Sequence, residues 1–213
     1  MPHAFLYFAD PLCSWCYGFG PEIARFIERR PGDRLDLVMG GLRAGNRDTM
    51  SNAFRDMLRG HWRHVAQASG LPFSEAILDR EDFIYDTEPP CRGVVTARNI
   101  EPSRAFAYFK SVQDAFYRDG REVTRSLVLA DIAAEAGYDR AEFLGALESV
   151  EMREATRNDF AMAQALGVGG FPTLAAAQGP QLYLVTSGYV KDEVLDQRVA
   201  EIDRLTAQKT RSA

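Results

Sequence analysis

The chain has 213 residues, 46% of them hydrophobic, with 13 Phe, 8 Tyr and 2 Trp, which is enough to build a packed core and excludes an intrinsically disordered chain. The formal net charge of −5 lacks the basic excess of nucleic-acid-binding proteins. No segment approaches the ~18–20 apolar residues that cross a bilayer, so we expect neither a nucleic-acid partner nor a membrane partner.

The N-terminal segment, MPHAFLYFADPLC, has no charged region before its apolar run and no cleavage site of the secretory kind. On the expectation that Met1 is the natural start, we predict that the protein is cytoplasmic. The 3 cysteines cannot form a disulfide framework. A close cysteine pair in the cytosol is more often catalytic or metal-binding than structural.

The first forty or so residues predict a strand–helix–strand unit. Ala4–Ala9 is a continuous apolar run, typical of a strand buried on both faces. Cys13–Arg30 is predicted to be helical, with a kink or restart at Pro21. Leu35–Leu42 predicts a second strand. Because a helix connects the two strands, we expect them to be parallel.

The middle of the chain predicts helices and no convincing strand. The expected helices are Ser51–Ser69, Ser74–Tyr85, Cys91–Ile100, Ser103–Tyr117, Val123–Ala136 and Ala141–Glu148. The predicted elements that follow are a helix over Val150–Leu166, a hairpin of strands Thr173–Ala177 and Leu182–Thr186, and a helix over Asp192–Leu205 before a frayed tail, QKTRSA. We therefore predict one sheet assembled from residues 1–44 and 150–213, with a helical domain inserted at residues 45–149.

Cys13 and Cys16 form a CxxC motif where the first strand meets the helix. The unpaired N–H groups and dipole of a helix N-terminus favour a thiolate, and can lower a thiol pKa from about 8.5 to roughly 3.5–7.5. On this interpretation Cys13 attacks a disulfide and Cys16, one turn further on, resolves the mixed disulfide. Two buried thiols, or a zinc site completed by Cys91 and a histidine, remain as alternatives.

The segment GVGGFPTL places Pro172 between a pair of glycines and a predicted strand. Proline is tolerated at the start of a strand and can adopt a cis peptide bond at modest cost. A cis bond would leave the preceding backbone groups free to pair with an extended peptide. A trans proline in an ordinary loop is the alternative.

Together, the CxxC motif, the helical insertion and GVGGFPTL before a terminal hairpin resemble the thioredoxin superfamily, and more closely the DsbA family of thiol–disulfide oxidoreductases. The segments YFADPLCSWCYGF, GGLRAG, TEPPCRGVVTARN and GVGGFPTL are similar to its FrnE-like cytoplasmic branch, whose members are described as predicted protein-disulfide isomerases. The resemblance spans nearly the whole chain. It implies an α/β thioredoxin fold, a mixed four-stranded sheet flanked by helices, with an inserted all-helical domain.

The resemblance also implies roles for individual residues. Cys13 would attack and Cys16 resolve, while a cis Pro172 would face them and the backbone of Phe171 would receive a substrate peptide. The aromatic residues expected to form an apolar binding surface are Trp15, Tyr17, Phe19 and Phe171. Ser14-Trp15 stands where the periplasmic oxidant has Pro-His, so we expect a less oxidising couple.

Several other side chains are weaker candidates. Cys91 follows two prolines and opens a predicted helix. It is either an accessory thiol at the mouth of the site, with its pKa lowered by the helix and by Arg92, or a buried anchor. Arg43 either binds an anionic group, such as a glutathione carboxylate, or faces water.

No metal site is expected. His61 and His64 share a helix face without a third ligand. No buried acid that relays protons is identifiable either, because Asp10 and Glu22 are interpreted as ordinary acids at the start of a helix.

We predict a dithiol–disulfide oxidoreductase that acts on peptide or protein disulfides through Cys13 and Cys16. Its only redox group would be that cysteine pair, with no separate cofactor and with glutathione as a candidate co-substrate. A monomer or a homodimer would serve this chemistry. The alternatives are a kappa-class-like glutathione transferase or isomerase that acts on a small molecule, and a non-catalytic, redox-sensitive chaperone.

Overall fold

The computed structural model describes residues 2–211, with side chains described through residue 208. Four strands in this part of the chain form one mixed sheet in the order β2-β1-β3-β4. They are β1 (Ala4–Ala9), β2 (Arg34–Met39), β3 (Thr173–Gln178) and β4 (Gln181–Ser187). The β1–β2 pair is parallel, as expected from the helix that joins them, and the other two pairs are antiparallel.

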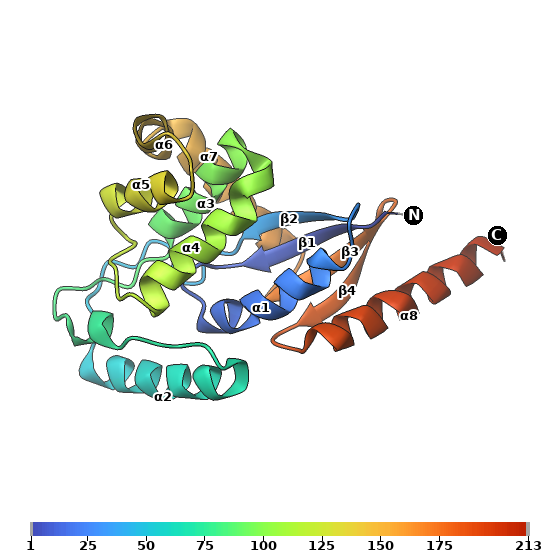
Figure 1. The fold of residues 1–213 in the computed structure, drawn as a ribbon, viewed down its shortest axis with the longest axis horizontal. Helices are drawn as coiled ribbons and strands as arrows, with labels where there is room; N and C mark the ends of the chain where they lie inside the picture. Colours follow the sequence, from blue (N-terminus) through green and yellow to red (C-terminus); the bar gives the residue numbers. More distant parts are fainter. Residues whose placement is uncertain (1, 212–213) are drawn as a thin grey trace.

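Eight α-helices surround this sheet in the described residues (Figure 1). Their bounds are α1 Ser14–Glu28, α2 Asn52–Ser69, α3 Glu88–Ile100, α4 Ala105–Tyr117, α5 Ser126–Glu135, α6 Arg140–Leu147, α7 Val150–Ala165 and α8 Asp192–Arg211. The mixed sheet flanked by helices confirms the predicted α/β thioredoxin fold.

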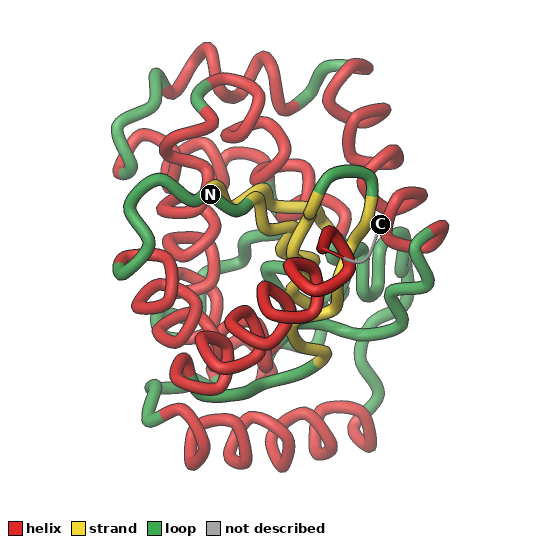
Figure 2. The backbone as a smooth tube through the Cα atoms, turned by 90° about the vertical axis from the view of Figure 1, so that its right-hand side faces the viewer, coloured by secondary structure: helices red, strands yellow, loops and turns green. Residues whose placement is uncertain are grey.

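The side chains of β1 alternate between two hydrophobic layers, as the period of a strand requires. Phe5 and Tyr7 belong to the main core, which also holds residues of α1 and α8. Phe8 points the other way and packs with Val38 and with Ala163 of α7. Figure 2 shows the strands at the centre, with helices on both sides. This two-sided burial explains why β1 reads as a continuous apolar run.

One local prediction is wrong. Ser74–Tyr85 contains only a short 3-10 turn at Ala76–Asp79 in place of a helix. Beyond that turn Phe83 and Tyr85 are buried while Ile84 is exposed, an alternation typical of extended chain, and Ile84 makes an isolated bridge with Thr49. Helix α1 continues past Pro21 without a restart, and a kink at that residue, the other form of the expectation, stays a prediction.

The C-terminal helix is longer than predicted. It continues from Asp192 through Arg211, into the segment expected to fray, while residues 212–213 lie outside the described part of the chain. No helix within residues 2–211 is both long and apolar enough to cross a bilayer. The strands do come from the two ends of the chain, and the domain boundaries at residues 44 and 150 remain a prediction.

Candidate functional site

The two cysteines of the CxxC motif differ in exposure. Cys13 is the N-cap residue of α1 and is 7% exposed, whereas Cys16, on the first turn, is completely buried. Both are free thiols in this structure. Because Cys13 alone reaches the surface, a substrate sulfur can approach it and cannot approach Cys16 directly.

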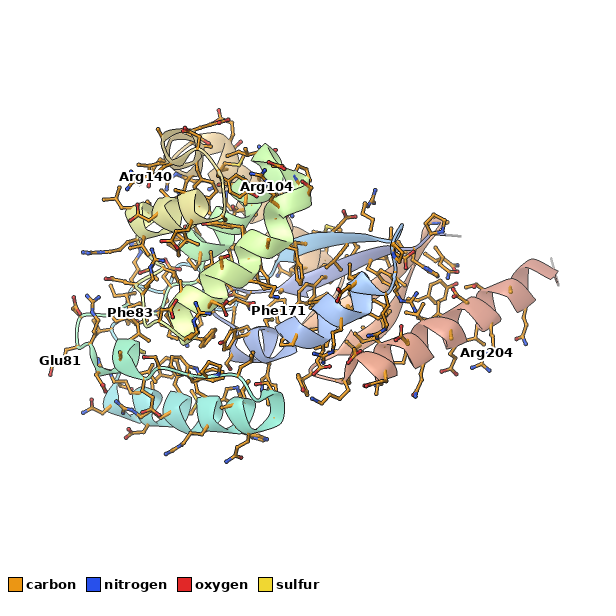
Figure 3. The ribbon with its side chains drawn as sticks, in the orientation of Figure 1. Glu81, Phe83, Arg104, Arg140, Phe171 and Arg204 are labelled. Atoms are coloured by element: carbon orange, nitrogen blue, oxygen red, sulfur yellow. The ribbon has the colours of Figure 1, made fainter. Side chains whose placement is uncertain are left out.

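The loop before β3 faces Cys13. The Cys13 Sγ donates a hydrogen bond to the carbonyl oxygen of Phe171 over 3.4 Å, and the Phe171–Pro172 peptide bond is cis. The Phe171 ring, labelled in Figure 3, lies directly on Gly40 at the end of β2, where a Cβ atom would overlap it. The structure thus brings together residues from three distant parts of the sequence, Cys13, Gly40 and Phe171.

The carboxyl group of Asp10 lies beneath this site and is fully buried. It accepts hydrogen bonds from the backbone N–H groups of Leu12, at 2.9 Å, and Leu42, at 2.7 Å. Burial raises the pKa of Asp10, although these hydrogen bonds lower it in part. The interpretation of Asp10 as an ordinary acid at a helix start is therefore wrong. The available signal was its place directly after a strand buried on both faces.

Asp10 and Cys13 both affect the pKa of Cys16. Burial raises the pKa of Cys16 well above its ordinary value, and the neighbouring Cys13 thiol and Asp10 carboxylate raise it further. Cys16 therefore holds its proton firmly, and any step that uses its thiolate needs a nearby group to accept that proton.

Cys91 does not lie at the mouth of the site. It is completely buried, and its Sγ donates to the Asp10 Oδ2 over 3.5 Å. Burial raises its pKa, and the Asp10 charge adds to the rise. Of the two interpretations of Cys91, the buried anchor is therefore confirmed, and the accessory thiol with a lowered pKa is wrong. Arg92 does not serve this thiol, because its guanidinium binds the Glu88 carboxylate and the Leu147 carbonyl.

Tyr7 was missed by the sequence reasoning. This residue of β1 is fully buried, and among the described residues its hydroxyl has no hydrogen-bond partner. Burial raises its pKa well above the ordinary value, with Cys16 and Cys13 as further causes. A buried tyrosine normally pairs its hydroxyl, so this group beneath the cysteine pair is unusual.

Glu22 belongs to a different cluster on α1. It is 3% exposed and binds Arg25, the Lys191 Nζ at 3.1 Å and the backbone N–H of Asp192 at 3.1 Å. These contacts join α1 to the start of α8. Glu22 is therefore a buried structural acid and not an ordinary acid of the first helical turn.

The aromatic residues expected at the surface divide into two sets. Trp15 is half-buried and makes edge contacts with His61 and His64, at ring distances of 6.0 and 5.6 Å. Tyr17 and Phe19 are buried in the core, so their expected place on a binding surface is wrong. The two histidines thus contact Trp15, and the described residues contain no group of three or more metal-binding side chains.

Arg43 lies on the loop after β2 and is exposed. Its guanidinium carbon is 4.5 Å from the centre of the Phe54 ring, and it has no carboxylate partner in the part of the chain that is described. Arg43 and Cys13 both line a cavity of about 260 Å³ between the start of α1 and α2. The guanidinium of Arg43, which has no carboxylate partner among the described residues, thus lies at the edge of a cavity that reaches the CxxC motif.

The chain matches a family described as "DSBA-like thioredoxin domain" over residues 6–199. Among solved structures, a putative protein disulfide isomerase from Nitrosomonas europaea is 33% identical, with a TM-score of 0.90, and 96% of this chain covers 99% of that one.

Two further relatives are informative. The cytosolic disulfide reductase DsbM from Pseudomonas aeruginosa is 27% identical, with a TM-score of 0.79, over 96% of this chain and 99% of that chain. It has also been solved with GSH. The ClpXP adapter protein SpxH from Halalkalibacterium halodurans is 26% identical over 171 residues, 78% of this chain and 56% of SpxH. The chain thus spans little more than half the length of the curated relatives that it matches.

Proposed function

Since this chain belongs to the DSBA-like thioredoxin domain family, we propose that it reduces peptide or protein disulfides in the cytoplasm through Cys13 and Cys16. The family and its structural relatives make it a thiol–disulfide oxidoreductase. The substrate, the direction and the compartment are our proposal. The cytosolic reductase DsbM, 27% identical over nearly the whole chain, supports the direction and the compartment.

One observation carries the proposal. The Cys13 thiol lies at the N-terminus of a fifteen-residue helix, 3.4 Å from the Phe171 carbonyl, with Cys16 buried one turn behind it. The carbonyl that now accepts from the thiol is a backbone group to which an extended substrate peptide could bind. An exposed nucleophile and a shielded second thiol are what a two-step exchange needs.

The reaction then takes two thiol–disulfide exchanges. The Cys13 thiolate attacks one sulfur of the substrate disulfide, so a Cys13–substrate bond forms and the other substrate sulfur leaves as a thiolate. Cys16 then loses its proton and attacks Cys13, which forms the Cys13–Cys16 disulfide and releases the second substrate thiol. Two electrons pass from the protein to the substrate. A thiol reductant, with glutathione as the candidate, returns the cysteine pair to its dithiol form.

Asp10 is suited to accept the Cys16 proton during the second exchange. Its carboxyl is fully buried and its pKa is raised. Its charge acts directly on Cys16. A base whose pKa is raised towards that of its donor takes a proton more easily than an ordinary carboxylate does. Asp10 is therefore assigned as the proton acceptor for Cys16.

A glutathione redox titration tests the proposal. Trp15, which lies between the two cysteines in sequence, reports the change by fluorescence, and acid-quenched mass spectrometry reports the covalent state. We expect a reversible two-electron transition that is absent in Cys16→Ser, with a potential near roughly −270 mV for a reductant. A potential near roughly −120 mV would reverse the proposed direction. If no Cys13–Cys16 disulfide forms, the proposed chemistry is wrong.

A partner-binding function is the second candidate, because the curated relatives are named as ClpXP adapters. Such a protein would bind its partner without thiol chemistry. Binding or suppression of aggregation that survives replacement of both Cys13 and Cys16 by Ala would favour it. The glutathione transferase alternative predicts instead a persistent glutathione adduct on the protein, without an internal disulfide.

A further inference from the structure

The cavity beside Cys13 is distinct from the loop that contains Phe171. It has a volume of about 260 Å³, and its walls come from the start of α1, the loop after β2 and one face of α2. Cys13 lies on its wall, whereas Phe171 and Pro172 do not. Cys13 therefore has the carbonyl of Phe171 on one flank and this cavity on another.

The walls of the cavity carry apolar groups that the fold leaves open to water. Leu42 is 48% exposed and Met57 is 52% exposed. Phe54 and Leu58 continue the apolar wall along α2. A concave apolar surface beside a reactive group is the usual form of a ligand site, because an apolar group that enters it leaves water.

One charged group of the same cavity has no carboxylate partner within the described chain. Arg43, held over the Phe54 ring, makes no ion pair there. By contrast Arg59, on α2, binds three carboxylates. The cavity is therefore complementary to an apolar ligand that brings a carboxylate to Arg43.

We propose that this cavity is the subsite for the residue next to the reacting cysteine of a substrate peptide. It takes one large apolar side chain, such as leucine or phenylalanine, while a carboxylate of the same peptide binds Arg43. The inference rests on the proposed function, since it names the substrate class for attack by Cys13. It selects peptides over glutathione, which has no apolar side chain to fill the cavity.

Four short peptides test the subsite. Each has one cysteine in a mixed disulfide with the same chromophoric thiol, next to either leucine or glycine, and carries either glutamate or glutamine two residues away. Release of the chromophore gives the second-order rate constant for attack by reduced protein. We expect the leucine peptides to react about tenfold faster than the glycine peptides, as burial of one apolar side chain allows.

Two variants locate the effect. Met57→Gln should remove most of the preference for leucine, and Arg43→Gln should remove a threefold or so preference for glutamate that weakens with added salt. The matched controls are Met162→Gln, at an exposed methionine of α7, and Arg47→Gln, at an exposed arginine of the same loop as Arg43. Both controls should keep both preferences.

The possible outcomes distinguish failure of the subsite from failure of the proposed function. Equal rates for all four peptides would overturn the subsite and leave the proposed function standing. A leucine preference that Met162→Gln reduces as much as Met57→Gln would also overturn it. No chromophore release from any peptide would overturn the proposed function, and the subsite with it.

Discussion

Two buried carboxyl groups near helix α1 differ in the groups that surround them. Glu22, in the middle of the helix, binds Arg25 and Lys191 and the backbone of Asp192. Asp10, just before the helix, has no cation at ion-pair distance among the described residues and contacts a thiol and backbone N–H groups. Both are almost completely buried, so exposure alone does not tell them apart.

The difference shows how to separate a structural acid from a chemical one. A buried carboxyl group surrounded by cations and other donors holds elements of the fold together. A buried carboxylate without a cation has a raised pKa and can exchange a proton with its neighbours. Glu22 therefore stabilises the junction of α1 and α8, while Asp10 is available to Cys16. Substitutions at the cysteines, at the two acids and at their neighbours test this division of roles.

Replacement of the cysteines should have the largest effect, because they are the reacting groups. Cys13→Ser should abolish mixed-disulfide formation, and Cys16→Ser should form the mixed disulfide and hold it. Mass spectrometry after acid quench measures both species. A Cys91→Ser control should retain exchange, since Cys91 is completely buried. If Cys91→Ser stops the exchange, the assignment to Cys13 and Cys16 is incomplete.

Asp10→Asn should slow the resolution of the mixed disulfide by about 10- to 100-fold, the usual contribution of a positioned general base. The measurement is decay of a preformed Cys13–substrate disulfide across a range of pH. A change in the shape of that pH profile identifies proton transfer, which a merely structural residue would not alter. Asp36→Asn is the control, because the Asp36 carboxylate lies on β2 and forms an ion pair with Arg34. An unchanged profile would remove Asp10 from the mechanism.

Glu22→Gln should act on stability and not on exchange. It replaces a buried carboxyl group among four donors, from Arg25, Tyr189, Lys191 and the backbone of Asp192, and we expect a loss of about 2 kcal/mol in the free energy of unfolding. The cations are half exposed, which keeps the loss from being larger. Denaturant unfolding measures it, with Glu28→Gln, exposed on the same helix, as the control. A slower exchange at unchanged stability would reverse the roles of the two acids.

Acid should weaken the cluster that Glu22 and Asp192 form with the arginines of α1. Burial alone would raise the pKa of Asp192, but hydrogen bonds with Glu22, Arg29 and Arg25 lower it to about 2, below its ordinary value of 3.8. A depressed carboxyl pKa stabilises the fold above the unfolded value, and that contribution is lost as the pH falls towards 2. Unfolding at several pH values should therefore show a shallower acid decline in Asp192→Asn than in the natural chain.

Tyr7→Phe should have the smallest effect on stability. The hydroxyl has no partner among the described residues, so its removal should change the free energy of unfolding by less than about 0.5 kcal/mol or raise it. Tyr108→Phe is the matched control, because that equally buried hydroxyl donates to the Leu129 carbonyl at 3.1 Å and should cost about 1 kcal/mol. Equal losses would mean that Tyr7 bonds a group such as Cys16.

The sequence predicted what local patterns determine. Apolar runs and turn residues predicted the strand before Cys13, the helix after it and the terminal hairpin. Each of these elements is present within about three residues of its predicted bounds, whereas α8 is longer than predicted. The helix predicted before α3 is wrong because the segment carries two patterns. Ile77 and Leu78 suit a helix, whereas Phe83 and Tyr85 alternate with an exposed residue, as in extended chain. Only packing against the core decides between those two patterns.

The site was predictable only in part, for a related reason. Cys13, Cys16 and Pro172 carry local signals. The burial of Asp10, by contrast, depends on the β2 loop and on Cys91, and the cavity depends on α2. Such contacts join residues that are 32 to 158 positions apart, and no local pattern specifies them. The exposure of Tyr17 and Phe19 was misjudged for the same reason, since α4 and β1 cover them.

Gly40 is a position outside the reactive groups at which the site can be altered. The Phe171 ring occupies the space that any side chain at residue 40 would need, and the carbonyl of the same residue accepts from Cys13. An alanine at residue 40 would therefore force the Phe171 ring to move. For protein engineering, residue 40 is thus a place to change the spacing of thiol and carbonyl while every sulfur stays as it is.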